Sequence, residues 1–199
     1  MVSNIKDQIK ANIDINRTLL EDQDFLEKIR LVTVEIIASL GGGGKLITMG
    51  NGGSASQAQH FSAEIINKFR LERKALPAIA LTADTASLTA ISNDSGFDFV
   101  FSRQIEALAK EGDICVAITT SDSNGERYSH SANLYRGLKM ARVLKLRTVG
   151  LVSRKTKGLL GLLDYAIVVP SSDTPRIQEA HGLAIHIICE EVEKFFVKK

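Results

Sequence analysis

The chain has 199 residues, of which 25 are basic and 23 acidic, so its formal net charge is +2. This near balance argues against nucleic acid or another polyanion as a partner, and the length suits one α/β domain with a full core. The two cysteines lack CxxC spacing and are typical of buried thiols in a reducing compartment. No apolar run reaches the roughly 20 residues of a membrane span, and residues 1–20 are too polar for a signal peptide. We therefore expect a soluble cytoplasmic protein that does not contact membranes.

Residues 1–40 carry apolar side chains at helical spacing, and the glycines at 41–44 end the pattern. A helical hairpin outside the core would expose an apolar stripe, which oligomerisation usually covers. The equal alternative is that this segment packs back onto its own sheet. We predict N-terminal helices at 1–40, forming an oligomer interface, ahead of an α/β core at 45–199. The two stripes are Ile5, Ile9 and Ile13, and Phe25, Ile29, Val32, Ile36 and Leu40.

After these helices, short apolar runs alternate with helical patterns. The runs are apolar throughout, as expected of parallel strands covered on both faces. The alternation predicts an α/β fold, a doubly wound five-stranded parallel sheet with helices on both faces. Ligands of such sheets bind beyond the carboxyl ends of the strands. The predicted strands are 46–49, 78–81, 114–118, 148–151 and 166–169, and the predicted helices are 54–69, 98–110, 132–145 and 175–196.

The most informative segment follows the first predicted strand and reads Gly50-Asn51-Gly52-Gly53-Ser54. Glycines allow a tight turn and close backbone approach, and a serine hydroxyl suits the start of a helix. Such a strand–loop–helix junction binds anionic or polyhydroxylated ligands at the helix N-terminus. His60 and Glu64 follow, four residues apart, and share one face of that helix. The pair can move protons or hold a metal ion.

Polar loops also follow other predicted strands. Hydroxyl-rich loops ahead of helices bind phosphate through O–H and backbone N–H groups without needing lysine, although one such loop alone is as often an ordinary helix cap. Because several of them converge on one sheet edge, we interpret them as parts of a ligand site. The loops are Asp84-Thr85 with Asn93-Asp94, Thr119-Thr120-Ser121-Asp122-Ser123, and Ser171-Ser172-Asp173-Thr174.

The chain as a whole resembles the sugar isomerase (SIS) domain family and, within it, the phosphoheptose isomerases. The resemblance runs from end to end, and its combination of motifs is far more discriminating than a lone glycine motif. The residues that carry it are Gly50–Ser54, His60-Phe61 with Glu64, Asn93-Asp94 with Gly96-Phe97, Phe101-Ser102-Arg103, Asp173–Glu179, His181 and His186.

The resemblance implies a homotetramer with active sites between subunits. It implies interconversion of sedoheptulose 7-phosphate and D-glycero-D-manno-heptose 7-phosphate, the first step of bacterial nucleotide-activated heptose synthesis for lipopolysaccharide or capsule. It also implies one zinc ion (Zn2+) per subunit, with His60, Glu64, Gln178 and His186 as ligands. The implied substrate contacts are Asn51, Gly52, Gly53, Ser54, Glu64, Asn93, Asp94, Thr119, Thr120, Ser121, Gln178 and, in the loop after the third strand, Ser123 and Ser131.

An aldose–ketose isomerisation moves a proton between C1 and C2 through a cis-enediol. It needs a base near the carbon, an acid near the carbonyl oxygen and stabilisation of the developing negative oxygen. Glu64 is the candidate base, and His186 is the partner that exchanges a proton with the oxygens. Gln178 and His186 lie eight residues apart, roughly 12 Å along a helix. They reach one ion only if their side chains lean together, if the helix begins after Gln178, or if they come from different subunits; His181 is the alternative ligand to His186.

The loop after the third predicted strand departs from the family pattern Ser-Thr-Ser-Gly-x-Ser. Asp122 stands at the glycine position, and extra residues precede Ser131. A carboxylate repels a nearby phosphate unless it points away, so Ser123 is an alternative phosphate ligand. Arg127 and His130 either restore positive charge near the phosphate or are solvated tips of a variable loop.

Two further hypotheses stay open. A non-catalytic relative with this fold binds a replication initiator, but it lacks the acidic residue of the His-x-x-x-Glu pair and the final histidine. This chain retains both, in Glu64 and His186, and their retention favours the enzyme. An isomerase or sensor of another phosphosugar is the second hypothesis, and the altered loop at 122–130 keeps it open.

Overall fold

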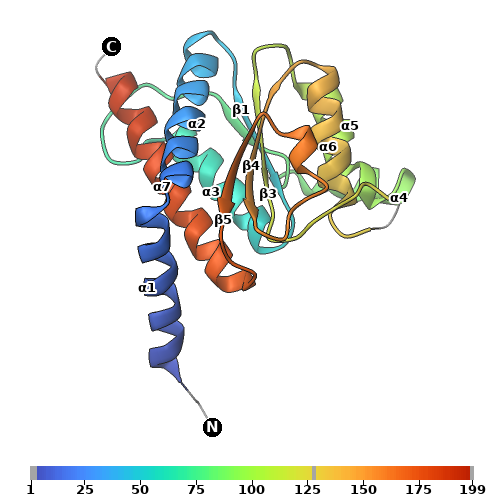
Figure 1. Cartoon of the computed structure of the whole chain (residues 1–199). Coiled ribbons are helices and arrows are strands. Elements are labelled where there is room, and N and C mark those ends of the chain that lie inside the picture. Colours follow the sequence, from blue (N-terminus) through green and yellow to red (C-terminus); the bar gives the residue numbers. More distant parts are fainter. Residues whose placement is uncertain (1–3, 127–128, 198–199) are drawn as a thin grey trace.

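The apolar runs form the predicted five-stranded parallel sheet in a computed structural model that describes residues 4–126 and 129–197 (Figure 1). The strands are β1 (Leu46–Gly50), β2 (Ala78–Ala80), β3 (Ile114–Ile118), β4 (Arg147–Ser153) and β5 (Tyr165–Val169). Their order is β2-β1-β3-β4-β5, with Thr48 of β1 opposite Val116 of β3. Every residue of β1 and β3 is buried, because helices cover both faces of the sheet.

Helices follow the strands, as the alternation predicts. They are α3 (Gly53–Ile66), α4 (Thr85–Asp94), α5 (Val100–Leu108), α6 (Ala132–Val143) and α7 (Thr174–Val197), with short 3-10 turns η1 (Phe97–Phe99) and η2 (Leu160–Leu162). The sequence pattern did not predict α4, η1 or η2. Helix α4 begins after Asp84, whose carboxylate accepts hydrogen bonds from the backbone N–H groups of Ala86 and Ser87. None of its residues is fully buried, so it carries no strong apolar periodicity.

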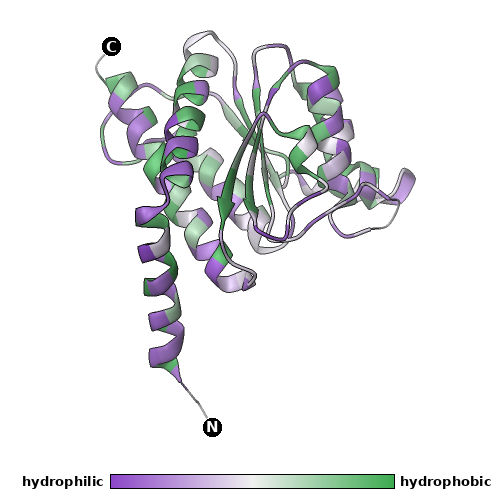
Figure 2. Ribbon diagram, in the orientation of Figure 1, coloured by the Kyte–Doolittle hydropathy of each residue, from purple (hydrophilic) through white to green (hydrophobic). Residues whose placement is uncertain are grey.

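Two hydrophobic layers hold the helices on the sheet. One layer joins α3 and α7 to one face, which includes Leu46 and Val116. The other joins α5 and α6 to the opposite face, which includes Ile47 and Ala117. Consecutive residues of one strand therefore serve different layers, as the pleat requires. Figure 2 shows the resulting apolar colouring along the strands.

The N-terminal region does not form a helical hairpin, one of the two alternatives that its sequence left open. It forms two consecutive helices, α1 (Ile5–Glu21) and α2 (Gln23–Gly41), separated at Asp22, whose side chain accepts a hydrogen bond from the N–H of Phe25. Helix α2 buries the second predicted stripe against α7 and the sheet, so the alternative of packing onto its own sheet is correct for α2. Helix α1 leaves the body of the molecule (Figure 1), and the first stripe, including Ile9, is exposed. Across the described residues, no helix has the length and apolar character needed to cross a membrane.

The sheet has a topological switch point between β1 and β3. These strands are hydrogen-bonded neighbours, yet β1 leads into α3 on one face while β3 leads through a longer loop into α6 on the other. Connections that diverge in this way leave a crevice outside the carboxyl ends of the two strands. The crevice lies between the glycine-rich junction and the hydroxyl-rich loop, the two segments predicted to bind ligand.

Candidate active site

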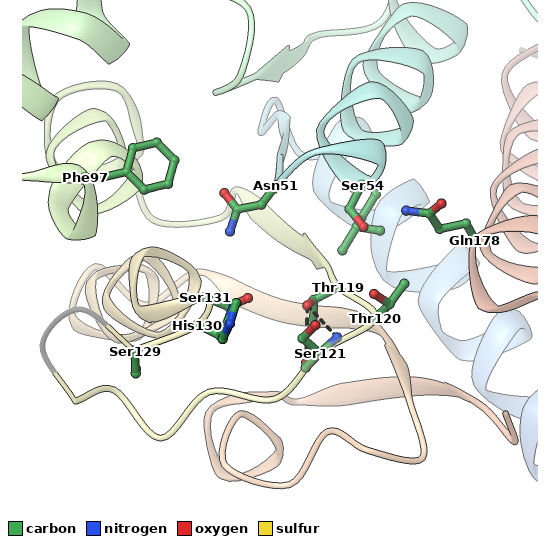
Figure 3. Close-up of a pocket in the computed structure, with 11 residues that line it drawn as sticks. Asn51, Ser54, Phe97, Thr119, Thr120, Ser121, Ser129, His130, Ser131 and Gln178 are labelled. Atoms are coloured by element: carbon green, nitrogen blue, oxygen red, sulfur yellow. Dashed lines mark hydrogen bonds between the residues drawn. The ribbon is translucent and has the colours of Figure 1, made fainter. Parts of the chain in front are cut away.

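A pocket of about 400 Å³ lies at this crevice. Asn51 and Ser54 reach it from the β1–α3 junction, Gln178 reaches it from the first turns of α7, and the loop after β3 faces them (Figure 3). Of the described residues that line it, most carry a hydroxyl or an amide, and none is lysine or arginine. The lining residues are Asn51, Ser54, Phe97, Ile118, Thr119, Thr120, Ser121, Ser129, His130, Ser131 and Gln178.

Glycine lets the β1–α3 junction approach α7. Gly52 has a φ of +54°, a left-handed conformation that side-chain-bearing residues rarely adopt. The side chain of Gln178 lies against Gly53, and a Cβ at that position would overlap its amide. The backbone carbonyl of Gln178 also accepts a hydrogen bond of 2.7 Å from Nε2 of Gln57, which lies one turn after Gly53 in α3. The structure thus brings the predicted contacts of the glycine motif and Gln178 together.

The side chain of Asn51 is held by Asn133, the second residue of α6. Asn51 Nδ2 donates to Asn133 Oδ1 at 2.9 Å, and Asn133 Nδ2 donates to Asn51 Oδ1 at 2.8 Å. Asn133 is almost completely buried, whereas Asn51 lines the pocket. This reciprocal pair joins the two sides of the switch point.

The loop after β3 supplies the hydroxyl side of the pocket. The Thr119 hydroxyl donates to the Ser121 carbonyl at 3.2 Å and accepts from the Ser121 N–H at 3.1 Å, so the loop folds back on itself. The Thr120 carbonyl accepts a hydrogen bond from the Ser153 hydroxyl at the end of β4. Thr119, Thr120 and Ser121 all line the pocket, as predicted for a phosphate-binding loop.

Asp122, which stands at the family's glycine position, points away from these hydroxyls. Its Oδ1 accepts hydrogen bonds of 2.8 Å from the backbone N–H groups of both Lys157 and Gly158. The carboxylate is therefore held by the β4–β5 connection, and hydrogen bonds to two backbone N–H groups weaken its repulsion of a phosphate. Close contact of Gly158 with the Ser123 backbone tightens the same junction, because a Cβ at 158 would overlap the Ser123 carbonyl.

The rest of this loop divides between the core and the pocket. Ser123 is buried outside the pocket lining, and its hydroxyl accepts a long hydrogen bond from the N–H of Gly125. Ser131 lines the pocket at the start of α6, with a left-handed φ of +57°. His130 is exposed but also lines the pocket, while Arg127 lies outside the described residues. Of the two predicted serines, the structure brings only Ser131 to the pocket.

A second cluster lies around His60, less than two turns after the start of α3 at Gly53. His60 Nε2 and His186 Nε2 are 2.9 Å apart, so one ring nitrogen donates and the other accepts. The other nitrogen of His60, Nδ1, lies 3.7 Å from Oε1 of Glu64. The ring of Phe69 packs against the His186 imidazole, with ring centres 5.5 Å apart. Of the four predicted proton-transfer or metal-binding groups, the structure thus brings His186 to one nitrogen of His60 and Glu64 near the other.

A buried ion pair between Arg73 and Glu193 supports the segment next to this cluster. The Glu193 carboxylate accepts hydrogen bonds from the backbone N–H groups of Phe69, Arg70 and Leu71, and lies 3.5 Å from Arg73. The Arg73 guanidinium in turn donates to the backbone carbonyl of Glu64. Burial raises the pKa of Glu193, but the three N–H groups and the arginine outweigh burial, so its pKa is lowered overall. The segment after α3 is held in place by a single ionised carboxylate.

The donor chemistry of the cluster suits zinc. Two nitrogen ligands, each about 2.0–2.1 Å from a tetrahedral zinc ion, lie roughly 3.4 Å apart, and those of His60 and His186 already meet at 2.9 Å. Glu64 faces the other nitrogen of His60, and Gln178 lies at the pocket, roughly 12 Å along α7 from His186. Among the described residues, no group of three or more His, Cys, Asp or Glu side chains is placed to hold a metal ion. Within one chain, only His60 and His186 of the four predicted ligands lie close enough to share one ion.

His181, the alternative ligand, is fully buried between α7 and the sheet. Its Nε2–H donates to the carbonyl of Val152 at 3.1 Å, and burial lowers its pKa to about 4. The structure therefore brings His186, not His181, to His60. Asn93 and Asp94 bond to each other at the exposed end of α4, outside the pocket lining.

Two residues of the site, Asn133 and Phe97, are not among those that the sequence predicts. Phe97 lies in the Gly96-Phe97 motif that carries the family resemblance, and that position is the signal that pointed to it. Asn133 has no comparable local signal, because its partner Asn51 is 82 residues away.

Comparison with known proteins agrees with this geometry. The family model described as SIS domain matches residues 14–153. A phosphoheptose isomerase from Geobacter sulfurreducens is 48% identical over 94% of this chain and 97% of its own. The phosphoheptose isomerase structure from Francisella tularensis has a TM-score of 0.87 and 32% identity, covering 96% of both chains. That from Neisseria gonorrhoeae has a TM-score of 0.78 and 37% identity, covering 94% of both. The chain therefore belongs to the SIS domain family and, within it, to the phosphoheptose isomerases.

Proposed function

We propose that this protein interconverts sedoheptulose 7-phosphate and D-glycero-D-manno-heptose 7-phosphate, the first step of nucleotide-activated heptose synthesis for lipopolysaccharide or capsule. The observation that carries the proposal is the pairing of a hydroxyl-lined pocket with a His60–His186–Glu64 cluster along the same two helices, α3 and α7. The pocket offers neutral donors for a phosphate and for sugar hydroxyls. The cluster offers the groups that a proton transfer at the other end of the sugar requires.

In this mechanism the chain's own residues hold the sugar and move the proton. The Thr120 and Ser121 hydroxyls donate hydrogen bonds to the phosphate, and Asn51 binds sugar hydroxyls. The Thr119 hydroxyl is used within the loop and holds it in shape. The Glu64 carboxylate removes the proton from one carbon and returns it to its neighbour. His186 exchanges a proton with the oxygens, so that the cis-enediol forms and collapses without a free oxyanion.

We propose that one zinc ion per subunit is held by His60, Glu64, Gln178 and His186. When bound, zinc acts as a Lewis acid that polarises the substrate carbonyl. Because Gln178 and His186 lie apart on one helix, their joint use favours a site shared between subunits of a homotetramer. The exposed apolar stripe of α1 and the groove of about 810 Å³ between α2 and α7 offer surfaces for such an assembly. We expect the tetramer to act in the cytoplasm.

Shared sites can be tested by mixing inactive subunits. When Gln178→Ala and His186→Ala subunits are co-expressed, hybrid tetramers regain activity if each site draws these residues from different subunits, since some sites then carry neither substitution. Activity that stays at the level of the two parents contradicts sharing.

The reaction itself is tested by incubating the protein with sedoheptulose 7-phosphate, with and without a chelator, and following aldose formation by NMR. Glu64→Gln should reduce turnover by at least about 10²-fold, the usual contribution of a general base. Glu72→Gln is the matched control, because Glu72 is exposed and pairs only with Lys68 among the ion pairs of the described residues. Absence of aldose under both conditions refutes the proposed function. Activity that survives complete metal removal refutes only the zinc assignment.

A second candidate, an isomerase of another phosphosugar, is favoured by His130, which the altered loop adds to the pocket lining. Conversion of a shorter ketose phosphate faster than of sedoheptulose 7-phosphate, in the same assay, would support it.

A further inference from the structure

The reciprocal amide pair between Asn51 and Asn133 has a defined polarity. Asn133 Oδ1 accepts a hydrogen bond of 2.9 Å from the backbone N–H of Leu134, in addition to the one from Asn51. The same N–H also donates to the Ser131 carbonyl at 3.0 Å. A backbone N–H can only donate, so it would repel an Asn133 NH2 group turned toward it, and the amide oxygen faces it instead. The Nδ2 of Asn133 is then left to face Asn51. The first turn of α6 therefore fixes which way round the Asn133 amide lies.

The orientation of Asn133 in turn dictates that of Asn51. A flipped Asn51 amide would set its NH2 group against the NH2 group of Asn133, and the two oxygens against each other. Both contacts are repulsive, and Asn133 is almost completely buried, where unsatisfied polar groups are costly. Asn51, which lines the pocket, is consequently left with one free N–H and one free oxygen lone pair, at opposite edges of its amide.

We propose that Asn133 is a positioning residue, which acts through Asn51 to present one donor and one acceptor in a fixed order to the hydroxyls of the bound sugar. The proposal rests on the function proposed above, because it concerns how that site reads its substrate. The free N–H and the free lone pair lie at opposite edges of the amide, so the N–H donates to one group of the sugar and the oxygen accepts from another. An Asn51 free to turn would hold neither edge in place for the sugar.

The test compares Asn133→Asp, Asn133→Ala, Asn51→Ala and the Asn51→Ala/Asn133→Ala double variant. Asn133→Asp keeps the acceptor for Leu134 and nearly the same shape, but it places a carboxylate oxygen against the amide oxygen of Asn51. We expect each Asn133 variant to raise KM for sedoheptulose 7-phosphate by roughly three- to tenfold, the range of one neutral hydrogen bond, while kcat changes less than twofold. In the Asn51→Ala background, Asn133→Ala should change KM by less than twofold, because the residue through which it acts is gone.

Asn124→Ala is the matched control, since Asn124 is exposed in the loop before α6 and, among the described residues, its side chain accepts only from the N–H of Glu126. It should leave KM unchanged. Equal KM increases from Asn133→Ala in both backgrounds would overturn the proposal, as would an unchanged KM in Asn133→Asp.

A crystal structure of Asn133→Asp separates this proposal from the proposed function. The Asn51 side chain should have moved away from residue 133, whether or not the enzyme accepts sedoheptulose 7-phosphate. An Asn51 side chain that keeps its place in that structure refutes the positioning role on its own.

Discussion

Acidification should weaken the fold through His181, a fully buried histidine of α7. Burial lowers its pKa from 6.5 to about 4, although the hydrogen bond to Val152 acts in the opposite direction. The imidazole is therefore neutral in the folded protein at neutral pH, while the unfolded chain takes up a proton below about pH 6.5. The folded-state pKa is the lower of the two. The stability that depends on the neutral His181 imidazole is thus fully present above pH 6.5 and is lost as the pH falls toward 4.

The size of the effect follows from the two pKa values. Each pKa unit corresponds to 1.36 kcal/mol, so a pKa that falls from 6.5 to about 4 limits the total loss to about 3 kcal/mol. Linkage between these pKa values gives a loss of about 2 kcal/mol between pH 7.5 and pH 5.0. That is a large share of the 5–15 kcal/mol that typically separates folded from unfolded proteins.

The assay is urea unfolding at pH 7.5 and 5.0, at one fixed protein concentration because association also stabilises the fold. His181→Gln keeps a donor for the Val152 carbonyl but cannot titrate, so it should lose about 2 kcal/mol less than the wild type over this interval. His130→Gln removes an exposed histidine and should follow the wild type. Parallel loss of stability in the wild type and His181→Gln would refute the reasoning.

Two further predictions concern the supports of the site. Gly53→Ala should push the flexible Gln178 side chain aside, raising KM for sedoheptulose 7-phosphate by roughly three- to tenfold with little change in melting temperature. Glu193→Gln should lower the free energy of unfolding by about 3 kcal/mol or more, measured by urea unfolding, because it leaves the buried Arg73 guanidinium without its counter-charge.

Matched variants make both outcomes specific. A Cβ at Gly182 meets only Gln57, at 3.9 Å, so Gly182→Ala should leave KM unchanged. Glu191 is half exposed and pairs with Lys194 on its own helix, so Glu191→Gln should cost less than about 1 kcal/mol. A Gly53→Ala enzyme with normal KM, or a Glu193→Gln protein as stable as its Glu191 counterpart, would contradict the corresponding contact.

The strands and the histidine–glutamate pair were predictable because their signals are local. An apolar run reports burial directly, and a spacing of four puts His60 and Glu64 on one helix face. The direction of Asp122 was not predictable, because its partners are backbone N–H groups 35 and 36 residues away. Nor was α4, whose ten residues bury none completely and so leave a weak pattern. The Asn51–Asn133 pair was not predictable for the same reason as Asp122, because side-chain contacts across the sheet edge produce no periodic pattern in the sequence.

The anchoring of Asp122 also bears on how this region can evolve. Asp122 fixes one end of the loop to the β4–β5 connection, and the start of α6 at Ala132 fixes the other. Between two fixed ends, each doubling of loop length costs only about 0.6 kcal/mol in closure entropy. Residues can therefore be inserted or deleted here while Thr119, Thr120 and Ser121 keep their places. The segment is a site where natural variation can reshape the mouth of the pocket and leave the chemistry intact.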